Sequence, residues 1–243
     1  IRADISIKPF QSRWKIYIIE KGETMTPQAQ NALLKTLEEP PEYAIIMILA
    51  DKLAGLLPTI VSRCQHVRIP GLSVQEVATI IEKKTDIPSR EALVFAKLSQ
   101  GLPGKGLELA VSHEYQQMRD QSLKILEELA QNTMIESMEH IDYFQDNRNN
   151  IMEILDMLEL WMRDILVLKQ SSCKNILINM DKLTQLESLA NIFTTQAIQG
   201  IIKSIEDSKK MLMFHANFQL TIENLLMNIQ GSDEYAQGGR STV

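Results

Sequence analysis

Cysteine is nearly absent from this 243-residue chain, which contains only Cys64 and Cys173. Two thiols so far apart exclude a disulfide framework and a cysteine zinc site, and they predict a reducing, cytoplasmic setting. The four histidines are scattered without ligand spacing, so we expect no metal site. No apolar run approaches the roughly 20 residues of a membrane helix, and no signal peptide is visible. Because the chain begins with Ile1 and not with Met, we expect it to be part of something longer.

Aromatic residues (5%) and glycine (10 residues) are also scarce, whereas methionine (12 residues), leucine and isoleucine are plentiful. β-Sheets favour aromatic and β-branched side chains, so this mixture favours packed helices over a β-sandwich. Hydrophobic residues make up 44% of the chain and charged residues 23%, which is ordinary for a globular protein. The net charge of −6 argues against broad, non-specific nucleic-acid binding, because such binding needs a positive surface.

Short apolar runs set the first 70 residues apart from the rest. Residues 16–19 and 44–50 are almost unbroken apolar segments, which predict buried strands of a parallel sheet with helices on both faces. Val67 and Ile69, which alternate with polar residues, suggest a third short strand. Residues 1–70 are therefore expected to form an α/β region.

A helix with clear start and stop signals lies between the first two predicted strands. Thr26 is a suitable N-cap, Pro27 occupies the first helical position, and Pro40 prevents continuation. Its apolar residues recur at helical spacing, at Ala29, Ala32, Leu33 and Leu37.

No strand signal recurs beyond the predicted third strand. Residues 73–76 have the form of a capping box, residues 88–89 open a second helix that Gly101 closes, and a third begins near Gly104. Three short helices predict a small helical domain over residues 71–112.

Longer helices are predicted over residues 113–230, where they form an all-helical bundle. Met138 and Ile141 mark one of them. The longest carries apolar residues at Ile151, Ile154, Leu155, Leu158, Trp161, Ile165 and Leu168. Residues 231–243, rich in glycine, serine and polar residues, are expected to be a disordered tail. The predicted fold class is thus α/β followed by all-α.

Two strings in the first region carry a specific resemblance. Residues 15–41 read KIYIIEKGETMTPQAQNALLKTLEEPP, and residues 57–64 read LPTIVSRC. They resemble the Walker B strand with its following helix, and the Ser-Arg-Cys motif, of the AAA+ subunits of bacterial DNA polymerase III clamp loaders.

The resemblance extends through the helical remainder and covers nearly the whole chain except the tail. SQGLPGKGLELA (99–110) resembles the lid domain of the clamp-loader family, and NFQLTIENLL (217–226) resembles its last collar helix. It implies that residues 1–70 are the C-terminal part of an AAA+ RecA-like α/β domain. It further implies a helical lid at 71–112 and a helical collar, which holds clamp-loader subunits together, at 113–230.

Four positions predict a hydrolytic site that has lost its function. A working ATPase of this class needs one carboxylate for Mg²⁺ and a second to orient or deprotonate the attacking water. Here these positions are Glu20 and Lys21, and a protonated lysine cannot act as a base. Asp51 stands at the family's sensor position, where its charge would repel a γ-phosphate, and Gly104 stands where active relatives place an arginine. We therefore expect no nucleotide cofactor and no independent ATPase activity.

Arg63, in contrast, is a residue that is suited to take part in ATP hydrolysis. Its planar, always charged guanidinium suits phosphate oxygens. The resemblance implies that Arg63, flanked by its motif neighbours Ser62 and Cys64, reaches the nucleotide site of a neighbouring subunit as an arginine finger. Cys64 itself is expected to be a small buried hydrophobe.

An intact finger beside a degenerate site predicts a non-hydrolysing subunit, or stator, of the clamp loader. The expected partners are the gamma/tau-type ATPase and delta-type subunits, with the sliding clamp and primer-template DNA engaged through the hetero-oligomer. Two alternatives stay open: an ATP-hydrolysing motor subunit with an unusual Walker B segment, and a helical scaffold that only binds partners.

Overall fold

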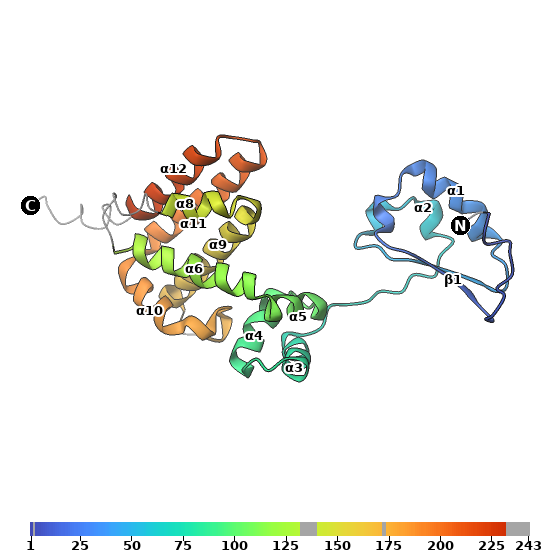
Figure 1. The fold of residues 1–243 in the computed structure, drawn as a ribbon, viewed down its shortest axis with the longest axis horizontal. Helices are drawn as coiled ribbons and strands as arrows, with labels where there is room; N and C mark the ends of the chain where they lie inside the picture. The colour runs from blue at the N-terminus through green and yellow to red at the C-terminus, as the bar shows by residue number, and fades with distance from the viewer. Residues whose placement is uncertain (2, 132–139, 172–173, 232–243) are drawn as a thin grey trace, which may run out of the picture. The chain divides into compact units, whose positions relative to one another are not determined.

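The structure, a computed structural model, describes residues 1, 3–131, 140–171 and 174–231 (Figure 1). The chain divides into two compact units, Ile1–Pro70 and Gly71–Val243. Within the described residues, no helix is long and apolar enough to cross a membrane.

The first unit is built around a pair of parallel strands. Its elements are β1 (Lys15–Ile19), η1 (Gly22–Thr24), α1 (Pro27–Glu38), β2 (Ala44–Ile48), η2 (Leu53–Gly55) and α2 (Pro58–Val61). The strands pair in register from Lys15 opposite Ala44 to Ile19 opposite Ile48. The predicted strand–helix–strand order is confirmed.

Helix α1 begins and ends where the sequence predicts. The Thr26 side chain accepts a hydrogen bond from the Ala29 N–H at 3.2 Å, and Pro27 is the first helical residue. The helix ends at Glu38, before the two prolines. Local capping chemistry is therefore sufficient to define this helix.

The prediction of a third strand at Val67 and Ile69 is wrong. Residues 65–70 contain no strand, and these two side chains are 71% and 85% exposed. A strand needs a neighbour for its backbone hydrogen bonds, and the described residues contain only the β1–β2 pairing. In the described part of the chain, β1 and β2 each keep a free edge, but residues 65–70 pair with neither, so the alternation of apolar residues alone does not form a strand.

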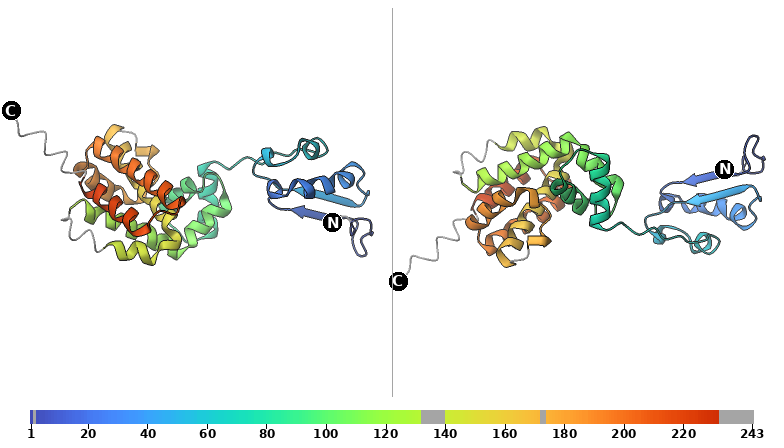
Figure 2. Two further views of the ribbon diagram at one scale, coloured as in Figure 1. Left: turned by 90° about the horizontal axis from the view of Figure 1, so that it is seen from above. Right: turned by 90° about the horizontal axis from the view of Figure 1, so that it is seen from below.

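The prediction that helices cover both faces of the sheet is also wrong for this structure. Ile16 and Ile18 on β1 are 54% and 59% exposed, and Met47 on β2 is 43% exposed. Figure 2 shows α1 and α2 on one side of the strand pair. Because alternate residues of a strand face opposite ways, a single helix layer buries only every second side chain.

The second unit is all helical. It contains α3 (Val74–Lys84), α4 (Ser89–Leu98), α5 (Pro103–Val111), α6 (His113–Leu129), α8 (Ile141–Asp146), α9 (Ile151–Gln170), α10 (Leu183–Ile192), α11 (Thr195–Met213) and α12 (Phe218–Gly231). Short 3₁₀ turns lie between them at η4 (Arg148–Asn150), η5 (Lys174–Ile176) and η6 (Met180–Lys182). The core includes the fully buried rings of Phe95, Phe144, Trp161 and Phe193.

The start signals predicted for the short helices are confirmed, for Ser73 and Glu76 form both hydrogen bonds of a capping box at the start of α3. The prediction that Gly101 caps α4 is wrong by position: the helix ends at Leu98 with Ser99 as its C-cap, and Gln100 follows with φ of 51°. Gly101 comes next with φ of +86°, and a Cβ there would lie 2.8 Å from the Leu72 carbonyl oxygen, so this position needs glycine. Met138 and the predicted tail beyond Gly231 lie outside the described residues. The assignment of residues 71–112 as a lid and 113–230 as a collar stays a prediction.

A buried carboxylate fixes the segment between α9 and α10. Asp164 on α9 is fully buried and accepts hydrogen bonds from the backbone N–H groups of Ile178 and Asn179 at 3.1 and 2.8 Å. It also accepts from the Asn179 side chain at 2.9 Å and pairs with Arg163 at 2.7 Å. Several donors around one carboxylate offset the cost of burying its charge.

A second buried charge and a lysine bind the same segment from other helices. Arg119 on α6 is 6% exposed, pairs with Asp181 at 2.7 Å and lies over the Trp161 ring at 4.9 Å. The Lys97 ammonium on α4 donates to the carbonyl oxygens of Asn175, at 3.1 Å, and Leu177. Residues 174–182 therefore join α4, α6 and α9 within one unit.

Candidate functional site

Three of the predicted site residues lie at the carboxyl ends of the two strands. Glu20 and Lys21 directly follow β1, and Asp51 lies three residues after β2. Backbone hydrogen bonds from Leu49 to Ile19 (2.9 Å) and from Gly22 to Leu49 (2.7 Å) bring the two chain segments together. Glu20, Lys21 and Asp51 are exposed, and within the described residues their side chains make no hydrogen bond or ion pair.

The turn after β1 holds Lys21 in an uncommon backbone conformation. Lys21 has φ 50° and ψ 48°, in the left-handed region, and its carbonyl accepts the Thr24 hydroxyl at 2.8 Å and the Thr24 N–H at 2.9 Å. A Cβ at the following Gly22 would lie 2.4 Å from Ile48 Cγ2, so only glycine fits between the strand ends.

The side chains at this edge carry charges of both signs, carboxylates at Glu20 and Asp51 and an ammonium at Lys21. An ammonium at Lys21 cannot accept a proton, and its charge opposes a divalent cation beside Glu20. No group of three or more His, Cys, Asp or Glu side chains among the described residues is placed to hold a metal ion.

Gly104 belongs to the second unit. It is the second residue of α5, and no atom lies within 4 Å of the place where its Cβ would be. A side chain could therefore extend from this first turn of α5 without a clash.

Arg63 follows the four-residue helix α2, two residues after its last residue, Val61. Its Nε donates to Glu38 Oε1 at 2.8 Å, and its Nη1 donates to the Thr59 carbonyl oxygen at 3.1 Å. Nη2 lies 2.5 Å from the same Glu38 oxygen. The Arg63 side chain is 34% exposed and that of Glu38 49%, so the ion pair lies at the surface of the first unit.

The two motif neighbours of Arg63 have different surroundings. The Ser62 hydroxyl donates to the Thr59 carbonyl at 3.1 Å, so Ser62 and Arg63 both complete the end of α2. Cys64 is half-buried, and burial raises the pKa of its thiol. A raised pKa keeps the thiol protonated near neutral pH and lowers its nucleophilicity.

Gln30, which the sequence did not single out, fixes the start of α2. It is 2% exposed, its amide nitrogen donates to the carbonyls of Met25 (3.1 Å) and Gly55 (3.0 Å), and its amide oxygen accepts the Leu57 N–H at 2.7 Å. The available signal was its spacing, because Gln30 precedes Leu33 by three residues on the apolar face of α1.

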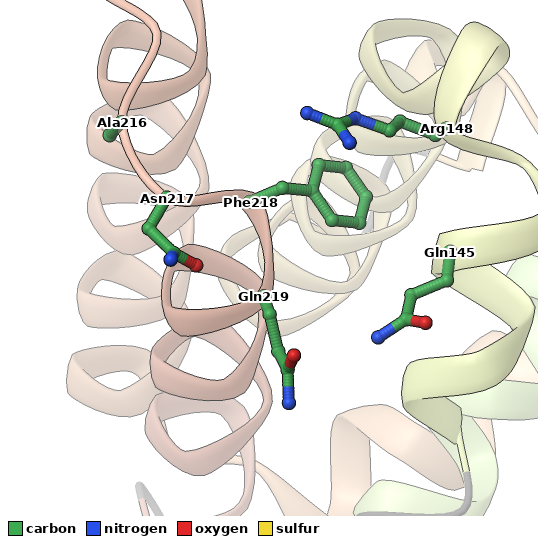
Figure 3. A pocket seen from close by; sticks show the side chains of 6 residues that line it. All are labelled: Gln145, Arg148, Ala216, Asn217, Phe218 and Gln219. Atoms are coloured by element: carbon green, nitrogen blue, oxygen red, sulfur yellow. The ribbon is translucent and has the colours of Figure 1, made fainter.

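Hollows among the described residues of the second unit are lined by none of the predicted site residues. One, of about 500 Å³, lies between the end of α8 and the start of α12, where Arg148 lies 4.9 Å over the Phe218 ring (Figure 3). Gln145 and Gln219 also line it. The other, a groove of about 1030 Å³, runs along α11 and α12.

Comparison with known proteins gives matches in both units. Residues 1–73 match the family described as DNA polymerase III, delta subunit. Residues 113–231 match the family described as DNA polymerase III, delta subunit, C terminal.

Similar individual proteins are also subunits of this polymerase. The delta-prime subunit of DNA polymerase III from Bacillus subtilis is 28% identical over 235 residues, which cover 95% of this chain and 70% of that protein. The gamma/tau subunit from Mycoplasma pneumoniae is 34% identical over 106 residues, which cover 42% of this chain and 16% of that protein. The solved structure of the Bacillus subtilis DNA clamp loader delta protein is 14% identical, with a TM-score of 0.40, over 94% of this chain and 81% of that one.

Proposed function

Because this chain belongs to the delta-prime family of DNA polymerase III clamp-loader subunits, we propose that it acts there as a non-hydrolysing stator. In this function Arg63 enters the ATP site of a neighbouring subunit as an arginine finger. The chain itself contributes no ATPase activity. Its partners are gamma/tau-type and delta-type subunits, and it meets the sliding clamp and primer-template DNA only through the complex.

The observation that carries this proposal is the surface position of the Arg63 guanidinium. It lies on the α1–α2 pair, where, among the described residues, Glu38 and one backbone carbonyl are its only hydrogen-bond partners, and a third of its side chain is exposed. A charged, planar group in such a place can meet phosphate oxygens of another chain and neutralise charge that builds up during phosphoryl transfer. The helical second unit, of which residues 113–231 match the delta C-terminal family, is the proposed assembly surface.

The strand-end residues support the negative half of the proposal. Lys21 replaces the carboxylate that would orient water, Asp51 adds a negative charge where a γ-phosphate would lie, and Gly104 offers no cation. Three unfavourable positions in one nucleotide site favour the stator over the motor subunit, and they accord with an AAA+ subunit that does not hydrolyse ATP.

The test is Arg63→Ala in a reconstituted clamp loader, with clamp and primed DNA present. Loss of an exposed ion pair changes folding stability by only about 0–1 kcal/mol, so the subunit should fold and assemble normally on size exclusion. ATP hydrolysis at the neighbouring site should fall by roughly 10³- to 10⁵-fold, with a smaller effect on total turnover if other sites keep their own fingers. Arg63→Lys should resemble the alanine variant, because an ammonium lacks the two-pronged geometry.

The matched control is Arg68→Ala, because Arg68 is an exposed arginine five residues away whose side chain makes no hydrogen bond or ion pair within the described chain. It should leave ATP hydrolysis unchanged. An Arg63→Ala complex that assembles and hydrolyses ATP at the wild-type rate would exclude the finger and favour a purely scaffolding subunit.

A further inference from the structure

The contacts of Arg63 leave its terminal nitrogens able to bind another group. A guanidinium has five N–H groups. The contacts with Glu38 engage one N–H on Nε and one on Nη2, and the Thr59 carbonyl engages one on Nη1. One N–H on each terminal nitrogen therefore stays unused, and each can donate to a phosphate oxygen.

Glu38 approaches the guanidinium from the side. Its Oε1 contacts Nε at 2.8 Å and Nη2 at 2.5 Å, so the carboxylate lies on the Nε edge and not across the two terminal nitrogens. A carboxylate across the terminal nitrogens would occupy the phosphate-binding edge. A carboxylate on the Nε edge restrains the side chain without covering the terminal edge, where the Thr59 carbonyl oxygen binds Nη1 alone.

Helix α1 holds the Arg63 segment at both of its ends. Gln30 on α1 binds the N–H of Leu57, just before α2, and Glu38, the last residue of α1, binds Arg63, just after α2. Ile60 between these contacts is 1% exposed and anchors α2 to the unit. Glu38 and Arg63 therefore both lie on backbone segments that these contacts hold in place, and the Glu38 carboxylate contacts the Arg63 guanidinium.

We propose that Glu38 is a positioning residue for the arginine finger. It restrains the Arg63 guanidinium so that its terminal nitrogens face the phosphates of the neighbouring subunit's nucleotide without a search among rotamers. This inference rests on the proposed function. Its physical basis is preorganisation, since a long side chain that is already oriented loses less freedom when its target binds.

The experiment uses a reconstituted clamp loader in which substitution has inactivated every ATP site except the one that this subunit serves. Glu38→Ala should lower kcat at that site about tenfold, with KM for ATP unchanged, because a misplaced catalytic partner slows chemistry more than binding. Glu38→Gln should stay within about threefold of wild type, because the amide oxygen still accepts from Nε although without charge.

The chain offers a matched control in the next residue. Glu39 is an exposed glutamate that caps the same helix, and its side chain makes no hydrogen bond or ion pair within the described residues. Glu39→Ala changes the net charge as Glu38→Ala does and should leave kcat unchanged. Equal thermal unfolding midpoints of the variants would show that the loss is not one of folding.

A double variant separates the two proposals. Glu38→Ala combined with Arg63→Ala should be no slower than Arg63→Ala alone, because Glu38 acts through Arg63. If Arg63→Ala hydrolyses ATP slowly and Glu38→Ala hydrolyses it at the wild-type rate or faster, the positioning role is refuted and the arginine finger is retained. A faster rate for Glu38→Ala would mean that Glu38 holds the arginine away from its target. A further loss in the double variant would likewise refute action through Arg63. If Arg63→Ala itself hydrolyses normally, the finger fails and the positioning role fails with it.

Discussion

Replacement of Gln30 by alanine tests the contacts that place the Arg63 segment. The buried amide makes three hydrogen bonds, to Met25, Gly55 and Leu57, at 3.1, 3.0 and 2.7 Å. A hydrogen bond of this kind contributes about 0.5–1.5 kcal/mol net, and more where its partner is left buried and unpaired. Gly55 is exposed, so water can replace its bond. We therefore expect Gln30→Ala to destabilise the first unit by about 2–3 kcal/mol.

Amide hydrogen exchange is the suitable assay, because it reads each unit separately. A loss of 2–3 kcal/mol should accelerate exchange of the α1 and β2 amides by roughly 30- to 150-fold, since about 1.4 kcal/mol corresponds to tenfold. Exchange in α9 of the second unit should not change. Gln28→Ala is the matched control, because Gln28 is an exposed glutamine of the same helix whose side chain has no hydrogen bond within the described residues. If Gln30→Ala exchanges within about threefold of this control, the three bonds do not stabilise the unit and the reasoning is refuted.

Two further predictions concern the second unit, whose buried Trp161 reports its unfolding in urea. Asp164→Ala leaves the donors of Asn179 without their buried acceptor and should lower the free energy of unfolding by about 3–5 kcal/mol. The control Asp86→Ala, at an exposed loop position, should stay within about 0.5 kcal/mol of wild type. Equal effects of the two substitutions would contradict a stabilising role of the Asp164 hydrogen bonds. Burial raises the pKa of Tyr115 to about 12, above the value near 10 of an unfolded tyrosine, so the unfolded chain ionises first. The free energy of unfolding should therefore fall between about pH 10 and 12, and Tyr115→Phe should flatten that fall; an unchanged slope would show that Tyr115 is not the group responsible.

The features that could be predicted from the sequence are those governed by neighbouring residues. Thr26 and Pro27 start α1, and Ser73 with Glu76 starts α3, because each cap is completed within four residues. The stop signal was approximate, because α4 already ends at Leu98 and Gly101 lies in the left-handed turn that follows. These signals need no knowledge of the remaining fold.

Features that depend on distant partners could not be predicted. Val67 and Ile69 have the alternation of a strand, but whether a strand forms depends on whether the segment lies along a sheet edge, which other parts of the chain decide. Asp164 and Asn179 lie 15 residues apart along the chain, and the Arg119–Asp181 pair spans 62. A charged residue within a helical sequence looks like a solvated position until its partner is placed beside it.

The candidate site divides in the same way. The motif around Arg63 could be predicted from its resemblance to a family, and Lys21 could be recognised as a poor base from its chemistry alone. The contact with Glu38 could not be predicted, because 25 residues separate the two side chains and only the packing of α1 beside α2 brings them together. Gln30 was missed for a related reason, since a polar residue on an apolar face is informative only when its hydrogen-bond partners are known.

The different positions of these residues offer a physical reason why a subunit could keep a finger and lose its own hydrolysis. Every contact that holds Arg63 comes from α1 and α2, within one unit, and needs only that local packing. The positions at which hydrolysis is proposed to be lost follow the two strands of the first unit and lie on α5 of the second unit. One unsuitable residue at position 21, 51 or 104 would be enough to end hydrolysis. Selection would then no longer maintain suitable residues at the other two positions. In the proposed function the finger serves another chain's site, so the same losses would leave the demand on Arg63, and on the α1 residues proposed to position it, unchanged.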